Sequence, residues 1–265
     1  MPTAVFVHPH PDDEAIFSGG AMRRAADRGW RVVLVLATSG EEGTMPDWVT
    51  VDAADHRRME TAEAAAHLGV DELHYLGYRD SGMAGSEANR TVGALAASIT
   101  AAAADLAELL RSVGADALVG QDPNGTYGHP DHVAVHHIGL DAAERAGVGE
   151  LLEVTLDRRW LRELRRDRIE RGRLDPAAWC AVELERLGID DPDAALVRLD
   201  VDAELSAKQA AMAAHASQVP DAADFMGIPP GTFHLVVRHE WYLRRLPASG
   251  PGPLEQALLR PGPAG

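Results

Sequence analysis

Hydrophobic positions in the first third of the chain alternate between unbroken apolar runs and runs with a helical period. Residues 4–7 and 32–37 are continuously apolar, as expected of strands covered on both faces in a parallel sheet. Residues 16–26 and 55–68 instead repeat apolar or small residues every three or four positions, which predicts helices. Residues 72–76 predict a third strand. This alternation predicts an α/β fold, with a Rossmann-like, mostly parallel sheet flanked by helices.

The remainder of the chain continues the alternation after a polar loop. Residues 77–88 contain glycines and few apolar residues, and this loop is long enough to reach over a site. The residues after it predict a helix at 91–113, whose apolar stripe consists of Val92, Leu95, Ile99, Leu106 and Leu110. Further strands are predicted at 117–119, 151–156, 195–201 and 233–243, and a further helix at 205–215.

Two segments depart from this pattern. Residues 158–190 predict a helical insertion, in which eight arginines between 158 and 173 alternate with acids, as in a solvated helix held by ion pairs. A second short helix is expected to begin at Asp175. Residues 247–265 contain five prolines and four glycines, and we expect a mobile tail there. Residues 1–246 are therefore predicted to form one domain, with a smaller strand region at its C-terminal end.

Composition narrows the class of partner. The chain has 25 basic and 41 acidic residues, so its net charge is −16, which disfavours nucleic acid and anionic membrane surfaces. A single cysteine, Cys180, excludes an internal disulfide framework and suits a reducing compartment. There is no secretory leader pattern and no apolar run near the roughly 20 residues of a membrane helix. We expect a cytoplasmic protein that acts on a small molecule.

The segment His10-Pro11-Asp12-Asp13-Glu14 follows the first predicted strand and opens the first predicted helix. Open α/β sheets bind their ligands at this carboxyl end of the strands. One imidazole and two adjacent carboxylates there can bind a cation, with one carboxylate left for proton transfer. Acids at a helix start also serve as caps, so this segment alone leaves a structural role equally open.

A second segment favours the metal site. Tyr127-Gly128-His129-Pro130-Asp131-His132 follows the apolar run at 117–119 and opens another helix, with proline in its first turn. Two strand-to-helix junctions that both carry histidine can converge at one edge of a parallel sheet. The pair is much more specific than either segment alone.

Together these segments resemble the zinc-dependent PIG-L/LmbE-like de-N-acetylases, which carry A-H-P-D-D-E near the amino terminus and H-P-D-H later. Pro9 stands where this family usually has alanine. The chain is most similar to the mycothiol-pathway branch, which includes a GlcNAc-inositol deacetylase and a mycothiol conjugate amidase. The resemblance extends through residues 40–43, 57–60, 77–83, 122–125 and 215–218.

The resemblance implies that His10, Asp13 and His132 bind zinc. Two histidines and one carboxylate leave a position open for water, as a catalytic zinc requires. The same set is also suited to ferrous iron. It further implies that Asp12 acts as general base toward the metal-bound water.

Other site roles follow from the resemblance. Tyr127 and His129 would stabilise the oxyanion or protonate the leaving amine, and Asp131 would orient His129. Arg57 and Asp80 would hold the hydroxyl groups of a sugar. A cation in the first turn of the 55–68 helix is unfavourable, which supports a ligand role for Arg57, although a surface arginine and a turn-forming aspartate remain alternatives.

The resulting function is removal of the N-acetyl group from an N-acetylglucosamine-containing small molecule. Alternatives within the family are an amidase of a thiol-sugar conjugate and a deacetylase of an antibiotic amino sugar. A metal-dependent phosphoesterase and a non-catalytic sugar-binding protein are alternatives of a different class. His8 is interpreted as structural, and so is His136, since a fourth protein ligand would close the metal site. His215 is expected to organise the loop below the site.

Overall fold

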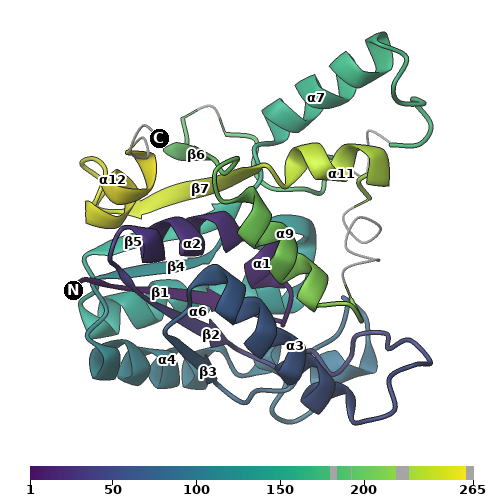
Figure 1. Cartoon of the computed structure of the whole chain (residues 1–265). Helices are drawn as coiled ribbons and strands as arrows, with labels where there is room; N and C mark the ends of the chain where they lie inside the picture. The colour runs from purple at the N-terminus through teal and green to yellow at the C-terminus, as the bar shows by residue number, and fades with distance from the viewer. Residues whose placement is uncertain (180–183, 192, 219–226, 261–265) are drawn as a thin grey trace.

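The computed structural model describes residues 1–179, 184–191, 193–218 and 227–260 of the chain. A seven-stranded sheet has the order β3-β2-β1-β4-β5-β7-β6 (Figure 1). Strands β1 to β5 are parallel, and β7 is antiparallel to both of its neighbours. This sheet confirms the predicted Rossmann-like α/β class. The strands are β1 (Thr3–His8), β2 (Arg31–Leu36), β3 (Glu72–Tyr75), β4 (Ala117–Gln121), β5 (Glu150–Thr155), β6 (Leu196–Asp200) and β7 (His239–Leu246).

Helices cover both faces of the sheet (Figure 1). One face packs against α4 (Ile99–Val113) and α6 (Pro130–Ala146). The opposite face packs against α1 (Asp13–Phe17), α2 (Gly19–Asp27), α3 (Ala53–Leu68) and α9 (Leu205–Ala214). Other described helices are the 3₁₀ turns η1 (Glu87–Arg90) and η2 (Leu95–Ala97), α5 (Gly125–Gly128), α7 (Arg158–Glu170), α11 (Pro230–Val236) and α12 (Pro253–Leu259).

The central strands are buried on both faces, which explains their continuous apolar runs. Val5 and Val7 of β1 point toward α4 and α6, whereas Ala4 and Phe6 point toward the opposite helix layer. Since successive side chains of a strand alternate between faces, both sets must be apolar when helices cover both sides.

The helix predicted over residues 16–26 is in fact two helices, α1 and α2, which meet at Ser18. The Ser18 hydroxyl lies 2.7 Å from Nε2 of His8, and its φ of −139° is not helical. Glu240 of β7 accepts hydrogen bonds from the backbone N–H of Gly20 (2.7 Å) and of the residue after it (2.9 Å). The start of α2 is thus satisfied by a carboxylate from the other end of the chain.

The predicted helix at 91–113 is wrong in its first eight residues. The backbone before η2 pairs with Arg79, whose N–H donates to the carbonyl of Gly93 (2.9 Å), and α4 begins only at Ile99. Val92 is 94% exposed and does not belong to the apolar stripe. Local pairing with the preceding loop overrides the helical period there.

The predicted strand at 233–243 begins too early. Residues 233–236 belong to α11, which starts with Pro230 in its first turn, a position where proline favours a helix. Strand β7 begins at His239 and supplies the antiparallel partner of β5 and β6.

Residues 247–260, where we expected a mobile tail, contain helix α12, while residues 261–265 lie outside the described part of the chain. Leu254 and Leu258 of α12 are buried in the core beside α2. Glu150 accepts hydrogen bonds from the first N–H groups of α12 (2.7 and 2.8 Å), and Glu255 pairs with Arg244. Because one sheet draws strands from both halves of the chain, we propose a single domain that reaches residue 260.

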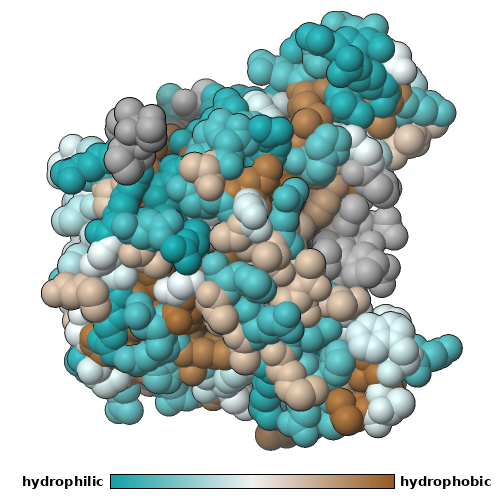
Figure 2. Space-filling model, in the orientation of Figure 1, coloured by the Kyte–Doolittle hydropathy of each residue, from teal (hydrophilic) through white to brown (hydrophobic). Residues whose placement is uncertain are grey.

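The arginine-rich insertion projects from the body of the protein through α7 (Figure 1), and hydrophilic residues cover most of this projection (Figure 2). Arg162 pairs with Glu185 and Asp190 (both 2.6 Å), so the acids come from beyond the helix as well as from within it. The second helix predicted from Asp175 lies partly outside the described residues, and Cys180 is not among them. None of the described helices is long and apolar enough to cross a membrane.

Candidate metal centre and pocket

The two motifs meet where the strand order changes direction. Strand β1 is hydrogen-bonded to β2 on one side and to β4 on the other. The first motif follows β1 into α1, and the second follows β4 through α5 into α6. This is a topological switch point, where open α/β sheets hold ligands beyond the carboxyl ends of the strands.

His10, Asp13 and His132 form a compact buried group. Oδ2 of Asp13 lies 3.4 Å from Nδ1 of His10 and 3.2 Å from Nε2 of His132. One ligand atom from each residue lies within 4.8 Å of the other two, which is compact enough to share one cation. His10, His129 and Asp131 form a second such group among the described residues.

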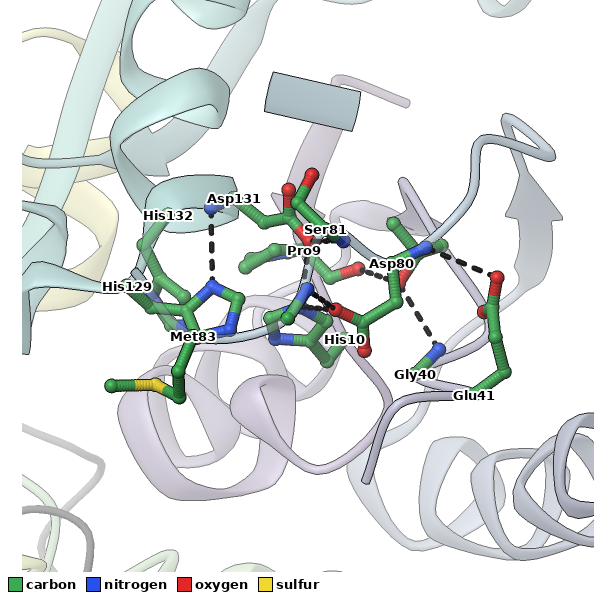
Figure 3. A network of polar contacts seen from close by, with 12 residues as sticks. Pro9, His10, Gly40, Glu41, Asp80, Ser81, Met83, His129, Asp131 and His132 are labelled. Atoms are coloured by element: carbon green, nitrogen blue, oxygen red, sulfur yellow. Dashed lines mark hydrogen bonds and ion pairs between the residues drawn. The ribbon is translucent and has the colours of Figure 1, made fainter. Parts of the chain in front are cut away.

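Each histidine of the first group has a further polar contact on its other ring nitrogen. Nε2 of His10 lies 3.2 Å from Oδ2 of Asp131, which also accepts a hydrogen bond from the N–H of Ser81 (2.9 Å) (Figure 3). Nδ1 of His132 lies 3.4 Å from Oε1 of Gln121. Such outer contacts fix the orientation of metal-binding imidazoles.

The Asp131 carboxylate, which we expected to orient His129, has its hydrogen-bond contacts with other groups, although the two side chains lie close together. Nδ1 of His129 accepts a hydrogen bond from the backbone N–H of Asp131 (3.1 Å), while the carboxylate is directed at His10 (Figure 3). His129 is the N-cap of α6, and this local bond satisfies an N–H group of the first helical turn. Sequence spacing could not distinguish these two partners.

Gln121 is a site residue that the sequence interpretation missed. It ends β4, and its side chain contacts His8 (3.0 Å), Thr126 (3.0 Å) and His132. A polar residue at the end of an apolar strand, just before a histidine motif, was the available indication. His8 continues this buried chain to Ser18, in agreement with a structural role.

Asp12 and Arg57 lie against each other at the pocket floor. Oδ2 of Asp12 is 3.3 Å from Nη2 of Arg57, and both side chains are buried. Burial raises the pKa of Asp12 to about 7, although the Arg57 charge opposes this. Arg57 also donates to the carbonyls of Gly40 and Pro11, so it organises the loop around Asp12 as well as facing the pocket.

Asp80 reaches the same site from the loop after β3. Its Oδ1 lies 3.6 Å from Nε2 of His10 and accepts the N–H of Gly82 (2.8 Å), and its own N–H donates to Glu41 (3.1 Å). Burial opposes ionisation, but the charge of His10, the hydrogen bonds with His10 and Gly82 and the charge of His129 together outweigh it and lower the pKa of Asp80. Asp80 is therefore closer to the metal group than a remote sugar contact would be.

Tyr127 and His129 form another part of the pocket wall. The Tyr127 hydroxyl is 3.1 Å from Nε2 of His132, and burial raises its pKa. Burial, followed by the charges of His10 and His132, lowers the pKa of His129 to about 3. Thr126, before Tyr127, has a positive φ of 60°, a conformation that non-glycine residues adopt only when their surroundings enforce it.

A pocket of about 400 Å³ opens over these groups. Six of the predicted site residues line it, and Asp13, Asp131 and His132 lie behind them. The sequence interpretation did not assign Arg186 of the insertion or Gln218 to the site. The lining residues are His10, Asp12, Glu42, Gly43, Thr44, Arg57, Asp80, Gly82, Met83, Tyr127, His129, Arg186 and Gln218.

His136 and His215, both expected to be structural, contact carboxylates. Nδ1 of His136 lies 2.7 Å from Glu153, and Nε2 of His215 lies 2.5 Å from Glu14. These contacts agree with the structural roles expected for both.

Sequence comparisons place the chain in a family. The protein has a Rossmann-like sheet with a candidate metal group at its switch point. Residues 5–143 match the PIG-L family model, described as GlcNAc-PI de-N-acetylase. The chain is 36% identical over 270 residues to the 1D-myo-inositol 2-acetamido-2-deoxy-alpha-D-glucopyranoside deacetylase of Salinispora arenicola, covering 94% of this chain and 86% of the relative. The same-named protein of Mycobacterium sp. (strain KMS) is 37% identical, covering 84% and 76%. The protein belongs to the PIG-L family of deacetylases.

Solved structures share the fold at low identity. The N,N'-diacetylchitobiose deacetylase of Pyrococcus horikoshii superimposes with a TM-score of 0.60 at 19% identity, covering 92% of this chain and 84% of that one. The 4-carboxy-2-hydroxymuconate hydratase of Pseudomonas putida gives 0.61 at 16%, covering 95% and 99%. Since a hydratase shares the fold, the fold alone does not specify the chemistry.

Proposed function

We propose that this protein is a zinc-dependent deacetylase that removes the N-acetyl group from an N-acetylglucosamine-containing small molecule. The observation that carries the proposal is the buried group of His10, Asp13 and His132 beneath a pocket that Asp12 lines. Relatives named as GlcNAc-inositol deacetylases across most of the chain support the substrate class. N-acetylglucosaminyl-inositol is therefore the first substrate to test.

The donor set fits a catalytic zinc ion. His10 would present Nδ1, Asp13 Oδ2 and His132 Nε2, because these atoms face one another while the other ring nitrogens contact Asp131 and Gln121. Bound zinc lowers the pKa of water to about 7 and polarises an amide carbonyl. Two imidazoles and one carboxylate also suit ferrous iron, so the metal content must be measured.

Asp12 would accept the proton of the attacking water. It lines the pocket next to Asp13, and Arg57 holds its carboxylate from behind. Glu14 is unsuited to this role, since its two oxygens already contact the N–H of Asp12 and the ring of His215.

His129 and Tyr127 would stabilise the negative charge that develops on the carbonyl oxygen. Nδ1 of His129 accepts a hydrogen bond, so the neutral ring carries its proton on Nε2 and is a donor there. The Tyr127 hydroxyl lies on the same pocket wall. After the C–N bond breaks, the proton accepted by Asp12 is available to the leaving amine.

Asp80 and Arg57 would orient the sugar. The single cysteine suits a reducing compartment and supports a cytoplasmic location. The test is release of acetate from N-acetylglucosaminyl-inositol by protein stripped with EDTA and then reloaded with zinc or with ferrous iron. We expect release only after reloading. His137→Ala, at an exposed position of α6, should behave like wild type.

Parallel assays separate the alternatives. A mycothiol S-conjugate tests amidase activity, an N-acyl glycopeptide tests an antibiotic substrate, and a colorimetric phosphate monoester tests a phosphoesterase. Faster turnover of any of these than of the inositol compound would reassign the substrate. Zinc binding without turnover of any compound would favour a sugar-binding protein.

A further inference from the structure

Asp12 has a backbone conformation that non-glycine residues rarely adopt. Its φ is 97° and its ψ is −34°, and only Thr126 among the other described non-glycine residues has a positive φ. Such a conformation persists only where the surroundings enforce it. Here it turns two adjacent acids in different directions: Asp12 lines the pocket, whereas Asp13 lies between His10 and His132.

The side chain of Glu14 holds the backbone of this turn by a hydrogen bond. Its Oε2 accepts a hydrogen bond from the backbone N–H of Asp12 (2.9 Å), and its Oε1 lies 2.5 Å from Nε2 of His215. Glu14 and His215 are both fully buried. His215 follows α9, 201 residues further along the chain, and α9 packs against α1, so this contact ties the turn to a separate helix.

The neighbouring acid does not depend on this contact. The carboxylate of Asp13 accepts a hydrogen bond from the backbone N–H of His10 (3.0 Å) and lies beside both imidazoles. The carboxylate of Asp12 lies 3.3 Å from the guanidinium of Arg57. The backbone N–H of Asp12 donates a hydrogen bond to Glu14. Loss of the Glu14 contact should therefore disturb Asp12 more than the metal ligands.

We propose that Glu14 and His215 are positioning residues that hold Asp12 in its positive-φ conformation, with its carboxylate aimed at the reacting water. This inference rests on the proposed role of Asp12 as general base. A displacement of about 1 Å of a reacting group can reduce turnover about a hundredfold. The two residues would thus control kcat without touching substrate.

The test compares variants that keep or remove the acceptor for Asp12. Glu14→Gln retains an oxygen for the N–H of Asp12, whereas Glu14→Ala removes it; His215→Ala removes the support of Glu14. The matched control is His136→Ala, which removes another buried histidine from a carboxylate, Glu153, outside the pocket. We would measure kcat, KM and zinc content, together with hydrogen exchange of the amides at residues 10–14 by mass spectrometry.

We expect Glu14→Ala and His215→Ala to lower kcat roughly 10- to 100-fold, with KM and zinc content within about twofold of wild type. Exchange at residues 10–14 should become faster. Glu14→Gln and His136→Ala should keep kcat within about threefold of wild type and leave this exchange unchanged. The Glu14→Gln result separates positioning from general loss of stability.

Unchanged kcat in His215→Ala, loss of zinc along with kcat, or equal losses in Glu14→Gln and Glu14→Ala would each overturn the proposal. If zinc-loaded wild type releases no acetate from any N-acetyl amino sugar, the proposed function fails instead. Hydrogen exchange then tests the positioning contact by itself: unchanged exchange at residues 10–14 in His215→Ala would overturn it too.

Discussion

The carboxylate of Asp131 lies 3.2 Å from Nε2 of His10, on the opposite side of the ring from Asp13. A ligand histidine held in this way keeps one tautomer and a fixed orientation, and loss of the outer carboxylate weakens metal binding about 10- to 100-fold. We therefore predict that Asp131→Asn raises the Kd for zinc by that factor, measured by competition with a chromophoric chelator. Asp141→Asn, an exposed change on the same helix, should leave the Kd unchanged. Equal Kd values for wild type and Asp131→Asn would contradict the assignment.

His132→Ala should remove the metal while the sheet stays folded. The change deletes one of three proposed ligands and leaves two, too few for a stable catalytic zinc site. Elemental analysis is expected to give far less than one zinc per chain, with an unchanged far-ultraviolet circular dichroism spectrum. Full zinc stoichiometry in this variant would show that another residue is the ligand.

Asp12→Asn should retain zinc but lose at least about a hundredfold in kcat, the lower range for removal of a general base. The amide has nearly the same shape as the carboxylate but cannot accept the proton of the attacking water. Zinc content and kcat on N-acetylglucosaminyl-inositol would be measured on the same preparation. A rate near that of wild type would place the base elsewhere.

Arg57→Ala should lower both stability and activity. Arg57 donates to the carbonyls of Gly40 and Pro11, and buried acceptors left without partners cost about 1–3 kcal/mol. We expect a lower free energy of unfolding in urea and a lower kcat/KM. The exposed neighbour Arg58 provides the control, and equal effects of Arg58→Ala would contradict a specific role for Arg57.

Asp80→Ala should reduce kcat/KM for the sugar substrate roughly 5- to 150-fold, which corresponds to about 1–3 kcal/mol at 1.4 kcal/mol per factor of ten. Zinc content should not change. A simple N-acetyl amine without ring hydroxyls should show a smaller effect of the substitution. Equal losses on both compounds would indicate that Asp80 acts at the metal group and not on the sugar.

The ring of His215 should make stability depend on pH. Burial alone lowers its pKa, but the charge of Glu14, the hydrogen bond with Glu14 and the charge of Asp12 together outweigh burial and the opposing Arg57, so that its pKa is raised above 6.5. The stabilisation is therefore fully present below about pH 6.5 and is lost as pH rises through the raised pKa. In metal-free protein, the difference in unfolding free energy between wild type and His215→Asn should be larger at about pH 6 than at about pH 9. An equal difference at both pH values would contradict this coupling.

The sequence predicted the parts of the fold that depend on local pattern. Continuous apolar runs identified the central strands, and two histidine-bearing junctions identified the edge of the sheet where His10, Asp13 and His132 meet. Contacts between distant residues could not be predicted in this way. The partner of the Asp131 carboxylate is such a contact, since His10 precedes it by 121 residues.

The C-terminal segment shows a second limit of local pattern. Proline and glycine around α12 resemble a tail, but burial of Leu254 and Leu258 against the core makes the helix part of the domain. Similarly, Val92 fits a helical period and yet is exposed, because the backbone beside it pairs with Arg79. In both cases tertiary contacts decide the structure where the local signal is weak.

Glu240 and His215 supply the buried partners of residues 14–21, near the start of the chain. During synthesis, Glu14 is made 201 residues before its partner His215 exists. The start of α2 therefore lacks its acceptor Glu240, and the carboxylate of Glu14 lacks its partner His215, until these late residues have been made. Assembly of the site thus depends on residues far along the chain, and a nascent chain that ends before residue 215 would carry both histidine motifs without the His215 contact that supports the turn at Asp12.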